Sequence, residues 1–348
     1  MLIQRETQEI IYKALSKQKL EVIELEKLLD LKTDSFENYA LMAAANQLTR
    51  EMAGSEGMIS GQVGLNVESC SKNCEFCSFA AKHNLIQHGY RLNEEQVELQ
   101  VKDWVNSGVN YISLMATADY EFQEFLKMSA VARRIMPSNM MLSANIGDFG
   151  REEARELKRF GYGRVYHVLR LGEGQYTDID PQTRINSIEA AASENLEIAF
   201  CIEPVGPEHT TKEIVDRIEL SLNFKPTMMA AMRRIPIAGT EFAGSAVVTE
   251  IKMAQIMAVI RLAYAHHAAT KTFYIHEPSS LGLLAGANLL CAETAANPRE
   301  VNESGEKGRG FSAESCHEIL YNAGYSRRKE PNYPGSWFES LNEMKLIV

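Results

Sequence analysis

The sequence predicts an α/β fold, a (β/α)₈ barrel of the TIM type that is closed or nearly closed. Eight short apolar segments are each followed by a segment of helical periodicity, and parallel strands need crossover connections of this kind. The chain has 348 residues, 45% of them hydrophobic, which is enough for one large barrel. An open doubly wound sheet is the alternative, although such a sheet usually has fewer strands.

The predicted strands and helices alternate along most of the chain. The strands are expected at residues 59–67, 111–116, 140–146, 164–169, 196–201, 228–233, 272–276 and 287–291. The helices are expected at residues 93–105, 120–135, 151–160, 181–194, 211–222, 249–266 and 280–285. Two helix starts follow from side-chain chemistry, because Asn93 with Gln96 forms a capping-box pattern and Pro181 suits a first helical position.

Three parts of the chain differ in composition. Residues 1–55 carry apolar side chains at spacings of three and four and are expected to form an N-terminal helical extension. Residues 56–291 hold the predicted barrel. Residues 292–348 are richer in Gly, Pro and charge, and we expect them to form a C-terminal cap of the barrel.

The charge and hydropathy patterns exclude several classes of partner. The net charge is −10 and the isoelectric point about 5.4, so an acidic surface argues against nucleic acid binding. No apolar run reaches the roughly 20 residues needed to span a bilayer, which argues against a membrane protein. The N-terminal residues lack the apolar stretch of a signal peptide, so the expected location is cytoplasmic.

The strongest chemical signal is a group of three cysteines directly after the first predicted strand. Cys70, Cys74 and Cys77 have the spacing C-x₃-C-x₂-C. A cubane iron–sulfur cluster normally takes four thiolates, so three on one loop leave one iron open to a small molecule. A zinc site is the weaker alternative, because zinc usually takes four ligands in paired units and no second close pair exists here.

This motif, with the aromatic Phe76 before the third cysteine, resembles that of the radical S-adenosylmethionine (SAM) enzymes. The resemblance implies a [4Fe–4S] cluster on Cys70, Cys74 and Cys77, with the open iron binding SAM. It also implies that the reduced cluster cleaves SAM to a 5′-deoxyadenosyl radical, which abstracts hydrogen from an unactivated carbon. An external electron donor such as ferredoxin or flavodoxin is implied as well.

Further SAM contacts are expected at the carboxyl ends of the strands. Ala116 and Thr117 follow the second strand, at the position of the family's glycine-rich segment, although its glycines and acid are absent. Arg170 and Glu173 follow the fourth strand, where related enzymes place a basic and an acidic SAM ligand. Arg184, near the start of the next helix, resembles a further arginine of that group. Surface salt bridges are the alternative for each of these charged residues.

The resemblance narrows to biotin synthase and its relatives, which include two-component lipoyl synthases, a hydrogenase maturase and methylornithine synthase. It rests on segments 66–70, 235–240 and 285–288 and spans residues 59–325. Biotin synthase implies a second, sulfur-donating cluster inside the barrel, held by cysteines on strands two, three and five and an arginine on strand seven. Leu114 and Ser143 stand near the first two positions, Cys201 stands near the third, and strand seven ends in His276.

A different auxiliary cluster is one interpretation of the other cysteines, and buried structural cysteines are the other. Its candidate ligands are Cys201, Cys291, Cys316 and His276.

Three functions follow from these alternatives. The first, which the three cysteines outside the motif favour, is sulfur insertion of the biotin or lipoyl synthase type, a transferase reaction that needs the auxiliary cluster. The second is a radical SAM isomerase or metallocofactor maturase without sulfur insertion, and the third is a non-catalytic iron–sulfur scaffold or electron carrier. The expected substrate is a small or carrier-bound molecule. A partner subunit is compatible with the sequence, and the oligomeric state is open.

Overall fold

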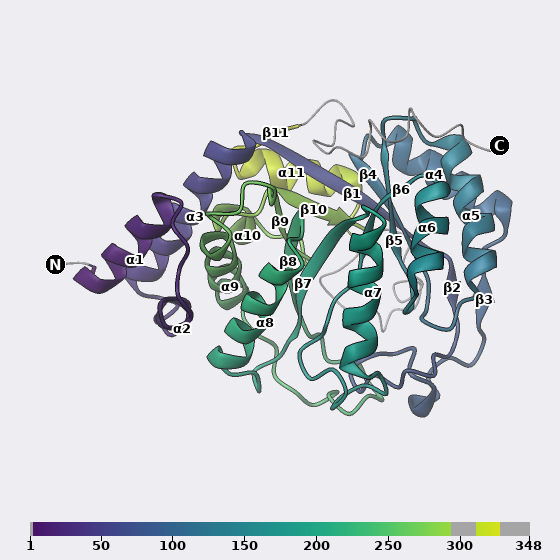
Figure 1. Ribbon diagram of the computed structural model, residues 1–348, viewed down its shortest axis with the longest axis horizontal. Coiled ribbons are helices and arrows are strands. Elements are labelled where there is room, and N and C mark those ends of the chain that lie inside the picture. Colours follow the sequence, from purple (N-terminus) through teal and green to yellow (C-terminus); the bar gives the residue numbers. More distant parts are fainter. Residues whose placement is uncertain (1–2, 294–310, 328–348) are drawn as a thin grey trace.

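The computed structural model describes residues 3–293 and 311–327, and its centre is a nearly closed parallel barrel (Figure 1). The barrel strands follow the order β10-β1-β4-β5-β6-β7-β8-β9. Their bounds are β1 (Glu56–Gly64), β4 (Tyr111–Met115), β5 (Met141–Asn145), β6 (Tyr162–Tyr166), β7 (Glu197–Val205), β8 (Met228–Arg233), β9 (Thr272–Ile275) and β10 (Leu289–Ala292). The predicted barrel is confirmed.

The helices that follow these strands form the outer layer of the barrel. They are α4 (Glu94–Asn106), α5 (Phe122–Ile135), α6 (Arg151–Arg159), α7 (Pro181–Ser193), α8 (Thr211–Asn223), α9 (Glu250–Ala263), α10 (Ser280–Leu284) and α11 (Ala313–Asn322). Both predicted helix starts are confirmed: Asn93 and Gln96 cap α4 reciprocally, and Pro181 occupies the first turn of α7.

Asn288 links the two strands at the seam of the barrel. Within the described residues β9 and β10 share no ladder, but the Asn288 amide Oδ1 accepts a hydrogen bond from the Phe273 N–H at 2.9 Å. Its Nδ2 donates to the Lys271 carbonyl, also at 2.9 Å. One buried side chain thereby satisfies backbone groups that a complete ladder would otherwise pair.

Three helices precede the barrel: α1 (Arg5–Leu15), α2 (Val22–Leu29) and α3 (Phe36–Ala53). Figure 1 shows them beside α8 and α9, and buried hydrogen bonds fix α3 there. Thr49 accepts from the Arg261 guanidinium at 2.9 Å and donates to the Gly286 carbonyl at 2.7 Å. The described residues 3–55 therefore pack on the outer layer, which supports the proposal of an N-terminal extension over residues 1–55.

The described part of the proposed C-terminal cap lies along the first strand. The short strand β11 (Ser326–Arg327) pairs with Glu56 and Gly57 at the amino end of β1. Leu320 of α11 packs so closely on Gly57 that a Cβ there would meet its side chain. The segments 294–310 and 328–348 of the proposed cap lie outside the described residues.

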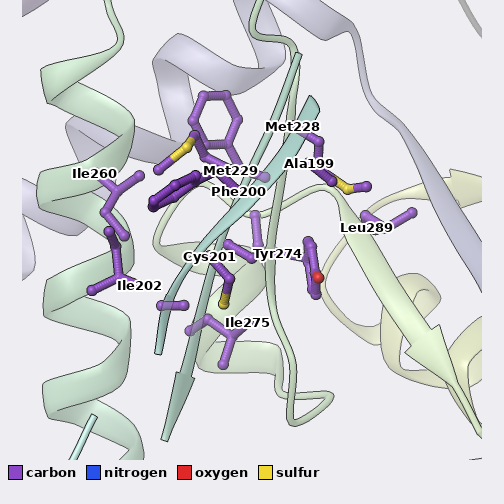
Figure 2. Packing of buried hydrophobic residues seen from close by; sticks show 14 of the residues in the cluster. Ala199, Phe200, Cys201, Ile202, Met228, Met229, Ile260, Tyr274, Ile275 and Leu289 are labelled. Carbon is purple, nitrogen blue, oxygen red and sulfur yellow. The ribbon is translucent and has the colours of Figure 1, made fainter. Parts of the chain in front are cut away.

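Side chains alternate along the strands between the helical layer and the barrel interior. Figure 2 shows Phe200 and Ile202 on the side of Ile260 from α9, with Tyr274 and Leu289 on the other side of the strands. Arg164 fills the amino-terminal part of the interior and is fully buried, with its guanidinium over the Tyr111 ring. Its Nη2 lies 2.7 Å from Glu197 Oε2. This packing leaves the carboxyl end of the barrel as the open end.

Candidate active site

A cavity of about 200 Å³ occupies the carboxyl end of the barrel, and every barrel strand or the residue after it contributes to its wall. The lining residues alternate, as the pleat requires: Ser60 and Gln62 come from β1, and Ser143 and Asn145 from β5. The site thus lies where barrel enzymes place their chemistry.

No helix in the part of the chain that the structure describes is long and apolar enough to cross a membrane.

The structure brings the three clustered cysteines together on the wall of this cavity. Their loop is held by backbone hydrogen bonds, from the Cys70 N–H to the Phe79 carbonyl at 2.7 Å and from the Cys77 N–H to the Cys74 carbonyl at 3.0 Å. A second segment braces the loop, because the Glu75 N–H donates to the Tyr176 carbonyl at 2.8 Å. The loop is therefore positioned by its own backbone before any ligand is considered.

The donor set suits a cluster better than a single ion. Across residues 3–293 and 311–327, no three Cys, His, Asp or Glu side chains converge closely enough to hold one metal ion. Thiolates that bind three different irons of a cubane stand farther apart than the ligands of one zinc ion. Three thiols on one cavity wall therefore fit a [4Fe–4S] cluster with one open iron.

The thiols lie in a partly buried setting that includes a cation. Burial raises the pKa of Cys70 and raises the pKa of Cys74 to about 12, while the nearby Arg170 guanidinium opposes the rise at Cys74. Metal ligation requires the thiolate. The positive charge of Arg170 thus favours the ligating form of Cys74.

Arg170 follows β6 and lines the cavity between two buried carboxylates. Its Nε lies 3.2 Å from Glu203 Oε1 on β7, and its Nη1 lies 3.7 Å from Glu173 Oε2. Burial alone would lower the pKa of Arg170, but Glu203 and Glu173 overcome it and raise the pKa. The guanidinium is fixed and charged at the cavity wall.

Glu173 takes a different position from the one a direct SAM ligand would need. Its side chain is 1% exposed and is absent from the cavity wall. It accepts hydrogen bonds from the Thr177 hydroxyl at 2.8 Å and from the Arg170 N–H at 3.1 Å. Glu173 therefore contacts Arg170 and Arg184 on the side that faces away from the cavity.

Arg184, on α7, also lines the cavity and is held by two carboxylates. Its Nη1 lies 3.0 Å from Asp148 Oδ1, and its Nε lies 3.5 Å from Glu173 Oε2. The buried His167 lies 3.0 Å from the same Asp148 oxygen. Burial raises the pKa of Asp148, but His167 and Arg184 outweigh this and lower it. Burial also lowers the pKa of His167, so its neutral form is favoured.

Ala116 and Thr117 lie on the cavity wall, as the sequence predicts for SAM contacts. Asn66 fixes this segment, because its Oδ1 accepts from the Thr117 N–H at 2.9 Å and its Nδ2 donates to the Thr117 hydroxyl at 2.8 Å. Phe76 lies in the cysteine loop but does not line the cavity.

The four predicted ligands of a second cluster are only partly brought together. Cys291 and His276 line the cavity. Cys201 lies on β7 between the lining residues Ala199 and Glu203 and faces the barrel interior with them, fully buried, whereas Cys316 is buried on α11. Cys291 accepts a hydrogen bond from Ser60 at 3.3 Å, and Cys316 donates to the Cys291 carbonyl at 3.7 Å. His276 Nε2 lies 3.1 Å from Glu293.

The strand register corrects one detail of the biotin synthase comparison. Ser113, and not Leu114, faces the cavity from β4. Ser113 pairs with Ser143 across the ladder, so serines face the cavity from the two strands on which the resemblance implies cysteine ligands. Leu114 is fully buried on the other face of the strand.

Several wall residues escape prediction from the sequence. Asn66, Tyr166, Glu203 and Glu293 all line the cavity. Glu203 had a usable signal, because a charged residue within an apolar strand is rarely buried unless it is paired. Tyr166 donates its hydroxyl hydrogen to Glu203, which completes the pairing of that carboxylate.

Known proteins resemble the chain in sequence and in fold, while no family model matches it. It is 26% identical to the biotin synthase of Chlorobaculum parvum over 270 residues, 71% of this chain and 79% of that protein. It is also 26% identical to the biotin synthase of Acetivibrio thermocellus over 285 residues, 77% of this chain and 87% of that protein.

Two solved structures share the fold. Methylornithine synthase (PylB) has a TM-score of 0.78 at 16% identity, over 96% of this chain and 99% of that one. HydG, a maturase of the [FeFe]-hydrogenase, has a TM-score of 0.80 at 16% identity, over 93% of this chain and 76% of that one. Together, the cysteine loop, the barrel and these similarities support a radical SAM enzyme of the biotin synthase-like branch, whose members use a [4Fe–4S] cluster and SAM.

Proposed function

We propose that Cys70, Cys74 and Cys77 hold the [4Fe–4S] cluster and that the adjoining wall of the cavity binds SAM. When bound, the cluster and SAM supply the hydrogen-abstracting radical of this superfamily, with electrons from an external donor. The observation that carries this assignment is the convergence of the three cysteines, Arg170 and Arg184 on one cavity. The barrel encloses that cavity, which limits the access of water to a reactive species.

The residues of the chain would bind and orient SAM by charge and hydrogen bonding. Arg170 and Arg184 present two cations suited to a carboxylate, and buried acids fix both of them. Asn66 holds the Ala116–Thr117 segment, whose backbone can meet the methionine part of SAM. Because these side chains are already held in position, SAM binding does not have to order them, and less conformational entropy is lost on binding.

For the reaction class, we favour hydrogen abstraction from a small substrate without sulfur insertion. Ser113 and Ser143, and no cysteine, face the cavity from β4 and β5, the two strands on which the biotin synthase resemblance implies cluster ligands. Of the four candidate ligands of a second cluster, Cys316 lies on α11, behind Cys291 and off the wall. An isomerase or a metallocofactor maturase needs the first cluster alone, and the two similar structures are named as a methylornithine synthase and a hydrogenase maturase.

Sulfur insertion of the biotin or lipoyl synthase type is the second candidate. Cys291 and His276 both face the cavity, and Cys316 lies directly behind Cys291. The similar curated proteins are named biotin synthase. These observations support a sulfur-donating role for Cys291 as the second candidate.

Anaerobic turnover tests the proposal. Reconstituted protein with SAM and a strong reductant should release 5′-deoxyadenosine and methionine, measured by liquid chromatography and mass spectrometry. Cys74→Ala should abolish the release, and Cys316→Ala, the matched control off the wall, should retain it. Release by Cys74→Ala at the wild-type rate would refute the assignment. Loss of release in Cys316→Ala with the fold intact would favour the second candidate.

A further inference from the structure

Three uncharged polar side chains form a row across neighbouring strands of the barrel interior. Gln62 of β1 pairs in register with Ser113 of β4, and Ser113 pairs in register with Ser143 of β5. All three residues line the cavity. Adjacent strands lie about 4.8 Å apart, so the three side chains share one layer of the interior. These residues, Gln62, Ser113 and Ser143, are named the polar row.

The polar row lies between a closed floor and the segment that we propose meets SAM. Tyr111, two residues before Ser113 on β4, lines the cavity, and its hydroxyl donates to the sulfur of Met228 on β8 at 3.6 Å. Since β4 and β8 lie on different sides of the barrel, this contact closes the interior below the row. Ala116 and Thr117 follow the other end of β4. The row therefore lies deeper in the barrel than the proposed SAM site.

The side chains of the polar row have no hydrogen-bond partner among the residues that the structure describes. Ser143 is only 2% exposed, so its hydroxyl is almost completely removed from bulk water. The interior layers of such barrels are usually filled by bulky branched side chains, whereas this layer holds two small serines. A buried hydroxyl without a partner is costly, so such groups normally meet a ligand or ordered water. The row therefore indicates a polar occupant.

The chemistry of the polar row favours an uncharged occupant. Hydroxyls and a carboxamide can each donate and accept a hydrogen bond, and none of them carries a charge. Arg164, the ladder partner of Ser143 on β6, does not line the cavity. A charged group placed against the row would be buried without an opposite charge from it, which is unfavourable. A hydroxyl or a carboxamide of the ligand fits the row without this cost.

We propose that the polar row binds an uncharged part of the substrate that carries hydroxyl or carboxamide groups. The space beside β4 and β5 then holds substrate, and not a second cluster. The inference rests on the proposed function, because it assigns the substrate class of that same cavity. It excludes a substrate that is purely aliphatic at this end, which would leave the hydroxyls unpaired, and one that is charged there.

The first test uses the stability of the ligand-free, cluster-reconstituted protein. Ser143→Ala removes a buried hydroxyl that has no protein partner, so the melting temperature should rise or fall by no more than about 1 °C. Ser129→Ala is the matched control, because the buried Ser129 hydroxyl lies 2.6 Å from both the Phe125 carbonyl and the Tyr162 hydroxyl. The control should melt about 2 °C lower or more. A loss of more than about 1 °C in Ser143→Ala would assign its hydroxyl to the fold and overturn the proposal.

The second test measures which chemical class binds. The hydroxyl probes are myo-inositol and D-ribose, and the carboxamide probes are acetamide and succinamide, each beside its O-methylated or N-methylated derivative. They are titrated calorimetrically into cluster-reconstituted protein with SAM under anaerobic conditions. Methylation removes hydrogen-bond donors, so at least one parent compound should bind about ten-fold more tightly than its derivative. Absence of any such preference overturns the proposal, as does tighter binding of the charged probes succinate and putrescine than of every neutral parent.

Variants and SAM binding locate the preference and separate the two proposals. The Ser113→Ala/Ser143→Ala double variant should reduce the preference to about three-fold or less, and Ser129→Ala should keep it. An unchanged preference in the double variant overturns the polar row, as does loss of its SAM affinity with the fold retained. Protein that binds and cleaves SAM but shows no preference contradicts the row alone. Protein that neither binds nor cleaves SAM contradicts the proposed function and the row with it.

Discussion

The two walls of the cavity differ in how their polar groups are satisfied. On the wall beside the cysteines, Arg170 and Arg184 each contact two carboxylates within 3.7 Å. On the opposite side of the barrel, the Tyr274 hydroxyl of β9 faces the cavity and forms no hydrogen bond with another described residue. One wall is organised by the protein itself, which suits a cofactor common to every turnover. The other has hydrogen-bonding capacity left for an exchangeable molecule.

The largest expected effect of a single change on the paired wall is at Arg170. Arg170→Ala removes a cation from the cavity and leaves Glu203 and Glu173 buried without it. In the proposed site Arg170 also pairs with the carboxylate of SAM. Truncating one partner of such a buried charge pair costs about 2–5 kcal/mol of binding free energy, so the dissociation constant of SAM should rise about 30-fold or more. Equilibrium binding of SAM under anaerobic conditions measures it. Arg159→Ala, at an exposed pair on α6, is the control and should leave SAM binding unchanged.

A smaller loss of SAM affinity is expected at Asp148, which acts through Arg184. Asp148→Asn keeps the shape of the side chain but removes the charge that fixes Arg184 Nη1 at 3.0 Å. A coupling of about 1 kcal/mol would weaken SAM binding about five-fold. The same titration measures this effect. In the Arg184→Ala background the substitution should have little further effect, and full additivity would show that Asp148 does not act through Arg184.

The hydrogen bonds of Asn288 at the seam of the barrel contribute to the stability of the fold and are separate from both walls of the cavity. Asn288→Ala removes the side-chain hydrogen bonds to Phe273 and Lys271 and leaves buried backbone groups unpaired. We expect the free energy of unfolding to fall by about 2 kcal/mol, measured by urea denaturation. A loss below about 0.5 kcal/mol would show that the seam does not depend on this residue.

The smallest expected effect is a pH dependence of stability from Asp148. Its folded-state pKa is lowered, so its pairing stabilises the protein above the unfolded pKa, about 3.9. This stabilisation is lost as the pH falls through the folded pKa. The difference in unfolding free energy between wild type and Asp148→Asn should therefore be largest near pH 6 and shrink below about pH 4. Asp103→Asn, an exposed position on α4, should show no such trend.

Sequence periodicity predicts the barrel well because burial alone determines the pattern of its strands. The predicted strand 228–233 coincides with β8, and the others overlap their observed counterparts. Strand β7 runs on to Val205, four residues past its predicted end, because Glu203 and Pro204 look unlike strand residues in the sequence. Val168 and Leu169 extended the predicted fourth strand, although they are buried in the segment after β6.

The candidate site is predictable where one loop carries it and less so where several strands combine. Cys70, Cys74 and Cys77 are close in the sequence, and their spacing alone indicates shared chemistry. Glu293 and His276 are 17 positions apart and meet only because β9 and β10 are neighbours across the seam. Likewise, the sequence could not show that Glu203 faces the cavity while Glu173 lies behind the arginines, since that depends on side-chain direction.

The central claim is that one cluster on the cysteine loop carries the chemistry. Anaerobic iron and sulfide analysis with Mössbauer spectroscopy tests it most directly, on the intact protein and on the Cys70→Ala/Cys74→Ala/Cys77→Ala triple variant. We predict about four irons per chain, with the spectrum of a single [4Fe–4S] cluster, in the intact protein and none in the variant. A cluster retained by the variant would contradict the claim and make Cys201, Cys291 and Cys316 the ligands to test next.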